Sequence, residues 1–211
     1  MRGMWGVKVR RRVITQASFV CPRCGVDRTG TEVEPQRWFT IGRAPIIPLA
    51  TLPREVVCAT CDHRSDPGVL DIPTSDQLTE YLTMATRSSI AFVVRSGRTS
   101  ALDFSIGEPV GLAAVGVMTT GGHEYDLAQL RHDVANIDDD QTRANLRRLS
   151  AELTPHGKQC YLNRMAAIAL ADGEMSARER MALIDLGVAL GMSAPHINGV
   201  LAVAALQPEA A

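Results

Sequence analysis

The spacing of apolar and polar residues changes once along the chain, within residues 65–73. Before this segment, short stretches of alternating or β-branched residues are separated by proline and glycine turns, which is typical of strands. After it, apolar residues recur every three or four positions, as expected of helices that bury one face. The pattern predicts a small β module at 1–64, a linker at 65–73 and a helical domain at 74–211.

The β module is predicted from four strand-like stretches. They lie at residues 5–9, 13–20, 37–41 and 55–58. Their few apolar residues make a core that is too small to fold without a further cross-link. A bound metal ion would provide such a link.

Capping residues mark the helices of the second part. Residues 74–77 (Thr-Ser-Asp-Gln) and 176–179 (Ser-Ala-Arg-Glu) have the pattern of capping boxes, and Thr154 precedes a proline suited to a first helical position. Gly97 and Gly191 are expected helix stops. About seven helices are predicted, at residues 74–96, 108–119, 124–136, 139–152, 155–171, 176–190 and 193–205.

Composition and charge support this division. The chain has 211 residues and is 45% hydrophobic but only 4% aromatic, which favours packed helices. Residues 1–64 carry 11 Lys and Arg against 5 Asp and Glu, a net +6, while residues 65–211 carry 11 against 18, a net −7. Four thiolates on a divalent cation would lower the first value to about +4, so the module would favour anions only mildly.

Four of the five cysteines form two Cys-x-x-Cys pairs, Cys21 with Cys24 and Cys58 with Cys61. Two thiols at this spacing can turn around one ion, and a tetrahedral set of soft thiolates selects Zn²⁺. Because all four ligands come from the protein, no position is left for water or substrate, and we expect one structural zinc. Redox dithiols are less favoured, because two pairs lie in a core-poor module.

The residues around these pairs resemble the bacterial zinc-ribbon family. The order of residues 19–25 (FVCPRCG), 37–41 (RWFTI), 46–49 (IIPL) and 57–61 (VCATC) is similar to the order of motifs in that family. With the helical pattern that follows, the fold class expected is a small β zinc ribbon followed by an all-α bundle. The resemblance implies a binding or assembly module with an apolar, proline-containing loop at 46–49.

Trp38 and Phe39 are expected to pack beneath the zinc knuckles, because a small domain must bury its few aromatic side chains. The alternative is a surface on which nucleic-acid bases stack.

Residues 165–193 resemble the TerB family of tellurite-resistance proteins. An apolar helix leads into an Ala-Asp-Gly turn at 171–173, then a Ser-x-x-Glu helix start and a second apolar helix. The resemblance extends more loosely over 74–205, and similar domains occur in some membrane-attached J-domain co-chaperones. It implies a helical domain that acts through protein contacts in a bacterial stress response, with peripheral association with a membrane complex as an option.

The TerB resemblance also implies, in some proposals, a divalent ion held by acidic residues, for which Asp172 and Glu179 are the matching positions. Hard cations need several oxygen ligands, and only Glu174 lies close by in sequence. Each residue also has a structural explanation, since an Asp-Gly pair forms turns and Glu179 completes a capping box. A second metal site and a structural role both stay open.

The remaining candidates do not predict an enzyme. Residues 138–140 (three Asp) lack the glycine and distal glutamate of a calcium loop and are expected to start a helix. Cys160 is expected to be a small buried hydrophobe. No P-loop, GxSxG, HExxH or dinucleotide motif is present, and four histidines have no partner at a metal-binding spacing: His123, His132, His156 and His196.

We expect a cytoplasmic protein, because no apolar signal region follows the early basic residues and the apolar run at 110–118 is too short to span a membrane. The sequence favours a zinc-binding adaptor or scaffold in a stress-response system of the tellurite-resistance type, with an unidentified protein partner. The alternative is a nucleic-acid-binding ribbon joined to a helical regulatory or oligomerisation domain. Trp38 or Phe39 would then stack on bases, and phosphates would bind Arg10, Arg11, Arg12, Arg23, Arg28, Arg37 and Arg43.

Overall fold

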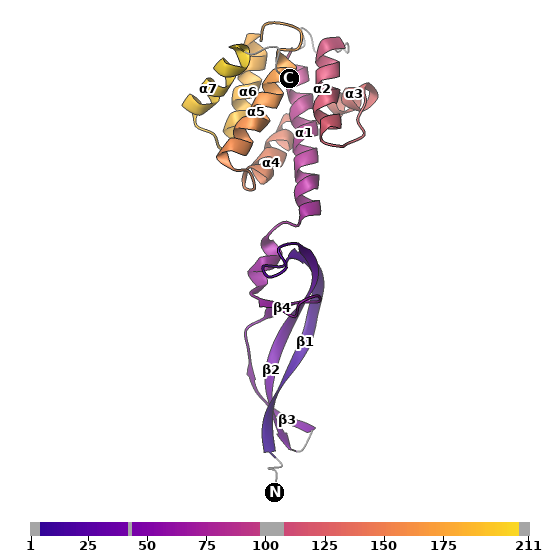
Figure 1. The fold of residues 1–211 in the computed structure, drawn as a ribbon, viewed down its shortest axis with the longest axis vertical. Coiled ribbons are helices and arrows are strands. Elements are labelled where there is room, and N and C mark those ends of the chain that lie inside the picture. Colours follow the sequence, from indigo (N-terminus) through magenta and orange to yellow (C-terminus); the bar gives the residue numbers. More distant parts are fainter. Residues whose placement is uncertain (1–4, 42–43, 98–107, 207–211) are drawn as a thin grey trace. The chain divides into compact units, whose positions relative to one another are not determined.

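The computed structural model describes residues 5–41, 44–97 and 108–206. The chain forms two compact units, Met1–Gln77 and Leu78–Ala211. Over the described residues, a β sheet with one short 3-10 helix is followed by seven α-helices (Figure 1). The predicted fold class, a β zinc-ribbon-like module followed by an α bundle, is therefore confirmed.

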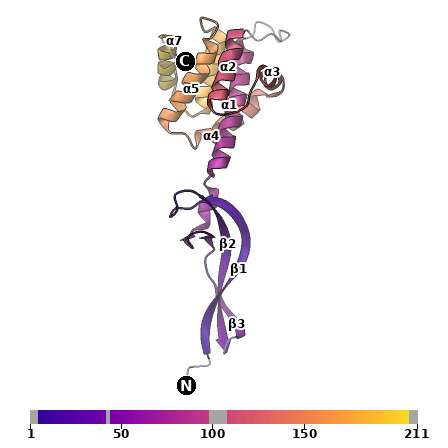
Figure 2. The same ribbon diagram turned by 45° about the vertical axis from the view of Figure 1, so that its right-hand side comes forward.

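The first unit is built on one long antiparallel ribbon. In this ribbon, β1 (Trp5–Val20) pairs with β2 (Asp27–Ile41) from end to end. β2 also pairs with β3 (Ala44–Thr51) near its C-terminal end and with β4 (Glu55–Cys58) near its N-terminal end. The short strand β5 (Arg64–Ser65) pairs with β4. Figure 1 shows β3 and β4 toward opposite ends of the ribbon, and Figure 2 shows the twist of β1 and β2 from another side.

The structure contains more strand than the sequence predicts. The predicted loop at 46–49 is wrong, because these residues belong to β3, where Ile47 lies opposite Phe39 and Pro48 opposite Trp38. Prolines fit there because β3 lies on the edge of the sheet. The first half of β2 was not predicted, since residues 27–36 are mostly polar and do not show the apolar alternation of a half-buried strand.

A bulge divides β1 into two halves. The register passes from Val13 opposite Val33 to Thr15 opposite Glu32, so Ile14 is an extra residue without a cross-strand partner. Successive side chains of a strand point to opposite faces of its sheet. The extra residue therefore moves every later odd-numbered side chain of β1 to the other face.

The C-terminal half of β1 contributes to the hydrophobic core of the first unit. Four side chains of this core are fully buried: Phe19, Cys21, Val56 and Cys58. Val69 and Leu70 of the 3-10 helix η1 (Pro67–Asp71) pack against this cluster. The turn-rich segment 65–73 thus adds apolar contacts to a core that is small even for a domain of this size.

The described helices of the bundle lie within a few residues of their predicted ranges. They are α1 (Ser75–Gly97), α2 (Glu108–Thr120), α3 (Leu127–Asn136), α4 (Asp139–Ser150), α5 (Pro155–Ala169), α6 (Ala177–Ala189) and α7 (Ala194–Leu206). None of the helices described is both long enough and apolar enough to traverse a lipid bilayer.

Two predicted capping boxes are confirmed. The Gln77 side chain accepts a hydrogen bond from the Thr74 amide at 3.0 Å, and the Thr74 hydroxyl accepts one from the Gln77 amide at 3.4 Å. Ser176 and Glu179 repeat this arrangement at the start of α6, with distances of 2.8 and 3.3 Å. At the end of α6, Gly191 has a φ of 71°, a conformation that glycine adopts without strain.

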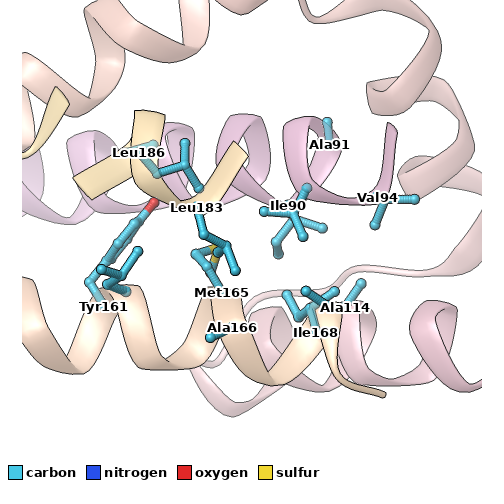
Figure 3. Close-up of a cluster of buried hydrophobic side chains, with 14 of the residues drawn as sticks. Ile90, Ala91, Val94, Ala114, Tyr161, Met165, Ala166, Ile168, Leu183 and Leu186 are labelled. Atoms are coloured by element: carbon cyan, nitrogen blue, oxygen red, sulfur yellow. The ribbon is translucent and has the colours of Figure 1, made fainter. Parts of the chain in front are cut away.

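The bundle core is formed by side chains that α1, α2, α5 and α6 direct toward one another. Figure 3 shows Ile90, Met165 and Leu183 near its centre. Tyr161 also enters this core, where its hydroxyl donates to Ser89 Oγ at 2.9 Å. Burial raises the pKa of Tyr161 to about 12, so its hydroxyl stays protonated and continues to donate.

A buried carboxylate connects α1 and α3. Asp133 is 2% exposed and accepts two hydrogen bonds from the Arg87 guanidinium, at 2.7 and 2.8 Å. The Tyr125 hydroxyl donates a third, at 2.8 Å. Burial and the Asp133 carboxylate raise the pKa of Tyr125 well above its usual value, which keeps this donor protonated.

Replacing Asp133 with alanine is expected to destabilise the bundle by about 2 to 3 kcal/mol, because the Tyr125 hydroxyl loses its acceptor in a buried position. The Arg87 side chain, at 41% exposed, can turn to water, which keeps the cost below that of a fully buried pair. Urea unfolding followed by helical circular dichroism measures this change. Asp140→Ala is the matched control, since that side chain is 96% exposed and should change stability by less than about 0.5 kcal/mol. Equal effects of the two substitutions would contradict the assigned role of Asp133.

Candidate metal centre

The four predicted cysteine ligands lie together at one end of the sheet. The sulfur atoms of Cys21, Cys24, Cys58 and Cys61 are all within 4.8 Å of one another. They are free thiols, and Cys21 and Cys61 have their sulfurs 3.7 Å apart. Zinc bound tetrahedrally at about 2.3 Å from each thiolate places the sulfurs about 3.8 Å apart. The cluster therefore has the dimensions of a four-thiolate metal site.

The two Cys-x-x-Cys pairs have the same backbone turn. The Cys21 carbonyl accepts from the Gly25 amide at 2.8 Å, and the Cys58 carbonyl accepts from the Asp62 amide at 3.0 Å. Gly25 and Asp62, each four residues after the first cysteine of its pair, have φ values of 71° and 55°. Glycine and aspartate are among the residues that tolerate this left-handed conformation. The local sequence is thus compatible with both turns.

Backbone amides also point at the sulfur atoms. The amide of Thr60 donates to the Cys58 sulfur and, against the effect of burial, lowers the pKa of that thiol to about 7. The His63 amide lowers the pKa of Cys61, but burial and the neighbouring thiols outweigh it and raise the value to about 12. A divalent ion would displace the thiol protons, because thiolates are the ligand form.

Close packing behind the cluster depends on Gly30, which lies opposite Cys58 in the sheet. A Cβ atom at this position would lie 2.6 Å from the Phe19 ring and 2.8 Å from Val56. The absence of a side chain lets the ring cover the metal-bearing end of β4. The roles of Gly30 and Phe19 were not predicted from the sequence, although an isolated glycine within a strand often marks such a close approach.

The prediction that Trp38 and Phe39 pack beneath the knuckles is wrong. Phe19 occupies that place. Trp38 lies opposite Lys8 in the far half of the ribbon, eight residues or roughly 26 Å along β2 from Gly30. Phe39, on the opposite face from Trp38, contacts Trp5, with ring centroids 6.1 Å apart.

Asp172 and Glu179 do not join a larger ligand cluster. Among the described residues, the four cysteines are the one group of three or more Cys, His, Asp or Glu side chains with converging ligand atoms. Asp172 is exposed, and Glu179 is buried with one carboxylate oxygen accepting from the Ser176 amide at 2.8 Å. A divalent ion at these two residues stays a prediction from the TerB resemblance.

Cys160 differs from its expected environment. It is exposed, not buried, and its sulfur lies 3.4 Å from His156 Nε2 one helical turn earlier on α5. The four-residue spacing of these two side chains in the sequence indicates this proximity. His123 is also placed by the structure, 3.0 Å from the Thr83 hydroxyl.

Fold and site together define a two-part protein, in which a β module carries four cysteines positioned to hold a metal ion and a second unit is an α bundle. Comparisons of the chain with models of protein families, with characterised proteins and with solved structures gave no match. The zinc-ribbon and TerB resemblances therefore rest on the sequence motifs that suggested them.

Removal of the metal by a chelator is expected to unfold residues 5–64 and leave the bundle folded, because the module has so small a core. The two signals are separable. Both tryptophans, Trp5 and Trp38, lie in the module, whereas the described α-helices lie almost wholly in the second unit. Chelation should change tryptophan fluorescence while circular dichroism at the helical band stays constant. Loss of both signals in one transition would show that the two units do not fold independently.

Gly30→Ala is expected to destabilise the module by about 1 to 3 kcal/mol through overpacking against Phe19. Gly6→Ala provides the control in the same ribbon, since a Cβ there would make an ordinary contact of 3.5 Å with the Thr40 hydroxyl. Denaturant unfolding followed by tryptophan fluorescence, with zinc bound, compares the two. If both substitutions have the same effect, the tight fit of Phe19 over Gly30 does not limit stability.

Proposed function

We propose that this chain is a non-enzymatic adaptor or scaffold that acts through protein contacts made by its metal-stabilised β module. The observation that carries the proposal is the large exposed apolar surface on the outer half of the ribbon. Monomeric soluble proteins rarely leave contiguous apolar patches of this kind uncovered.

The exposed apolar surface lies on one face of β1, β2 and β3. Side chains of cross-strand partners lie on the same face of a sheet. The strand register therefore places six apolar residues together, and we call the surface that they form the apolar face: Trp5, Val7, Val9, Phe39, Ile41 and Ile47. Trp5 is 66% exposed, Val7 58% and Ile47 52%. No described element covers them, and burying such side chains is the dominant favourable term in most protein associations.

The metal in this proposal is one structural zinc ion. Four thiolates provide a soft, tetrahedral and closed ligand set, which suits Zn²⁺ and leaves no coordination position for a reacting group. The ion would hold the base of the ribbon together, while the apolar face lies at the other end and makes the contacts.

The resemblance of residues 165–193 to TerB proteins supports placing this adaptor in a bacterial stress-response system of the tellurite-resistance type. The bundle would supply a second binding surface. Its described polar groups fit a structural role, since Asp133 is fully occupied by Arg87 and Tyr125 within the bundle.

Nucleic-acid binding is the second candidate, and it is favoured by one observation. Lys8, Arg10 and Arg12 lie on the face opposite to the apolar face, together with Trp38; we call this the basic face. The other five predicted phosphate ligands are dispersed. Arg11 and Arg37 lie on the apolar face, Arg23 lies between Cys21 and Cys24, Arg28 lies opposite Phe19, and Arg43 lies outside the described residues. A fall in affinity with rising salt is the expected signature of this function.

The adaptor function is tested by capturing partners of the full chain from its native cells. The wild type is compared with Cys58→Ser, which removes a predicted metal ligand, and with Cys160→Ser as the matched control. A partner retained at near-equal amounts by the wild type and the control, and lost with Cys58→Ser, is the expected result, because only the ligand substitution unfolds the module. Substantial hydrolase or transferase turnover by the purified chain, or partner retention that does not depend on Cys58, would contradict the proposal.

A further inference from the structure

We infer that the free edge of β1 over residues 5–13 binds an extended segment of a protein partner as an added strand, and that this segment alternates acidic with apolar side chains. The inference rests on the proposed function, because it names the surface and the chemistry through which the adaptor holds its partner. Three features of β1 carry it: an open hydrogen-bonding edge, two chemically different faces and unpaired positive charge.

The edge is open over the outer half of β1. Within the described sheet, β1 pairs with β2 alone, so its other side presents unpaired backbone amides and carbonyls. Every residue from Trp5 to Gln16 is exposed. The register with β2 is regular from Trp5 to Val13 and shifts only at the bulge that follows. Such a stretch is a template for a further strand.

The two faces of this stretch differ in chemistry. Trp5, Val7 and Val9 point to the apolar face, and Lys8, Arg10 and Arg12 to the basic face. A strand added at this edge would place alternate side chains beside each set. Apolar side chains would extend the surface already formed with Phe39 and Ile47, while acidic ones would lie opposite the three cations.

The positive charge of the basic face is available to a partner. Lys8, Arg10 and Arg12 make no ion pair within the part of the chain that the structure describes. In contrast, Arg11 on the other face donates to Glu55 at 3.2 Å, where Arg64 also approaches the same carboxylate at 3.6 Å. The unpaired cations are therefore those that alternate along the open edge.

A second copy of the chain fits this edge poorly. If two β1 edges paired with their faces aligned, residues 8, 10 and 12 of one copy would lie directly or diagonally opposite the same cations of the other. Like charges in these positions destabilise a pair of strands. Edge charges of this kind prevent strands from pairing with their own kind. The same charges select a partner strand of opposite sign.

Nucleic acid also fits the edge less well. Single-strand binding surfaces combine cations with several aromatic rings on one groove. Here Trp38 is the one aromatic side chain on the described basic face, whereas Trp5 and Phe39 lie on the other face with the aliphatic residues. An alternating strand satisfies both faces at once.

The probe is a blocked, fluorescently labelled peptide of alternating glutamate and valine, long enough to pair with residues 5–13, added to the zinc-loaded full chain. Fluorescence anisotropy is expected to show saturable binding that weakens as salt rises. Three control peptides isolate the cause: one with the same residues in two blocks, one with lysine in place of glutamate, and one N-methylated at alternate backbone nitrogens. Each should bind roughly tenfold more weakly or not at all, since each removes one requirement of strand addition.

The protein variant reverses the three cations together, as Lys8→Glu, Arg10→Glu and Arg12→Glu. It is expected to lower peptide affinity by roughly tenfold or more, since three opposite-charge pairs become like-charge pairs. The matched control carries Arg131→Glu, Arg147→Glu and Arg180→Glu, three exposed arginines of the bundle, and should bind the alternating peptide like the wild type. Tryptophan fluorescence verifies that the module of the first variant remains folded.

Several outcomes would overturn the inference. The alternating peptide could fail to bind at low salt, or the block or N-methylated peptide could bind equally well. Salt-sensitive binding of single-stranded DNA, lost in the three-cation variant while the peptide does not bind, would assign the basic face to nucleic acid instead. If the three-cation variant still captures the partner from cells, the adaptor function stands but the edge of β1 is not the surface that binds this partner. If the wild type captures no partner, the adaptor function itself fails.

Discussion

The convergence of four sulfur atoms is the constraint on which the β module depends. Cys21 and Cys58 are two of the four fully buried side chains of its core, so the ligands are also a large part of the hydrophobic interior. A conventional core of this size could not offset the conformational entropy lost on ordering a long ribbon. Bonds from the four sulfur atoms to a metal ion would provide that free energy at one place. The rest of the sheet then needs no second covering layer, and its outer half can remain exposed on both faces.

The features that the sequence predicts well are those determined by near neighbours along the chain. Helix starts depend on a hydroxyl and a carboxylate or amide three residues apart, and the hydrogen bonds at Thr74 and Ser176 form as expected. A Cys-x-x-Cys turn is equally local, since Gly25 and Asp62 adopt the required backbone conformation at equivalent positions. The number of helices and the identity of the four ligands follow from such signals.

The features that the sequence does not predict depend on which face of a sheet or helix a residue occupies. Trp38 and Phe39 are placed by their register with β1, which no local pattern specifies, and the general preference for burying aromatic residues gives the wrong location. Cys160 lies on the outer side of α5 although its neighbour Tyr161 is buried. β3 was missed because its two prolines suggest a loop, and only its place on the edge of the sheet makes them acceptable.

The bulge at Ile14 has a consequence for how β1 can evolve. If Ile14 were instead paired in a regular strand, the two-residue period would place Phe19 on the same face as Val7 and Val9, away from Cys58. Because the bulge changes the face on which odd-numbered residues lie, a single strand contributes to two unrelated surfaces. One surface packs against the cysteine ligands, and the other is open to solvent. Substitutions before the bulge can therefore alter recognition while the metal-bearing end keeps its packing.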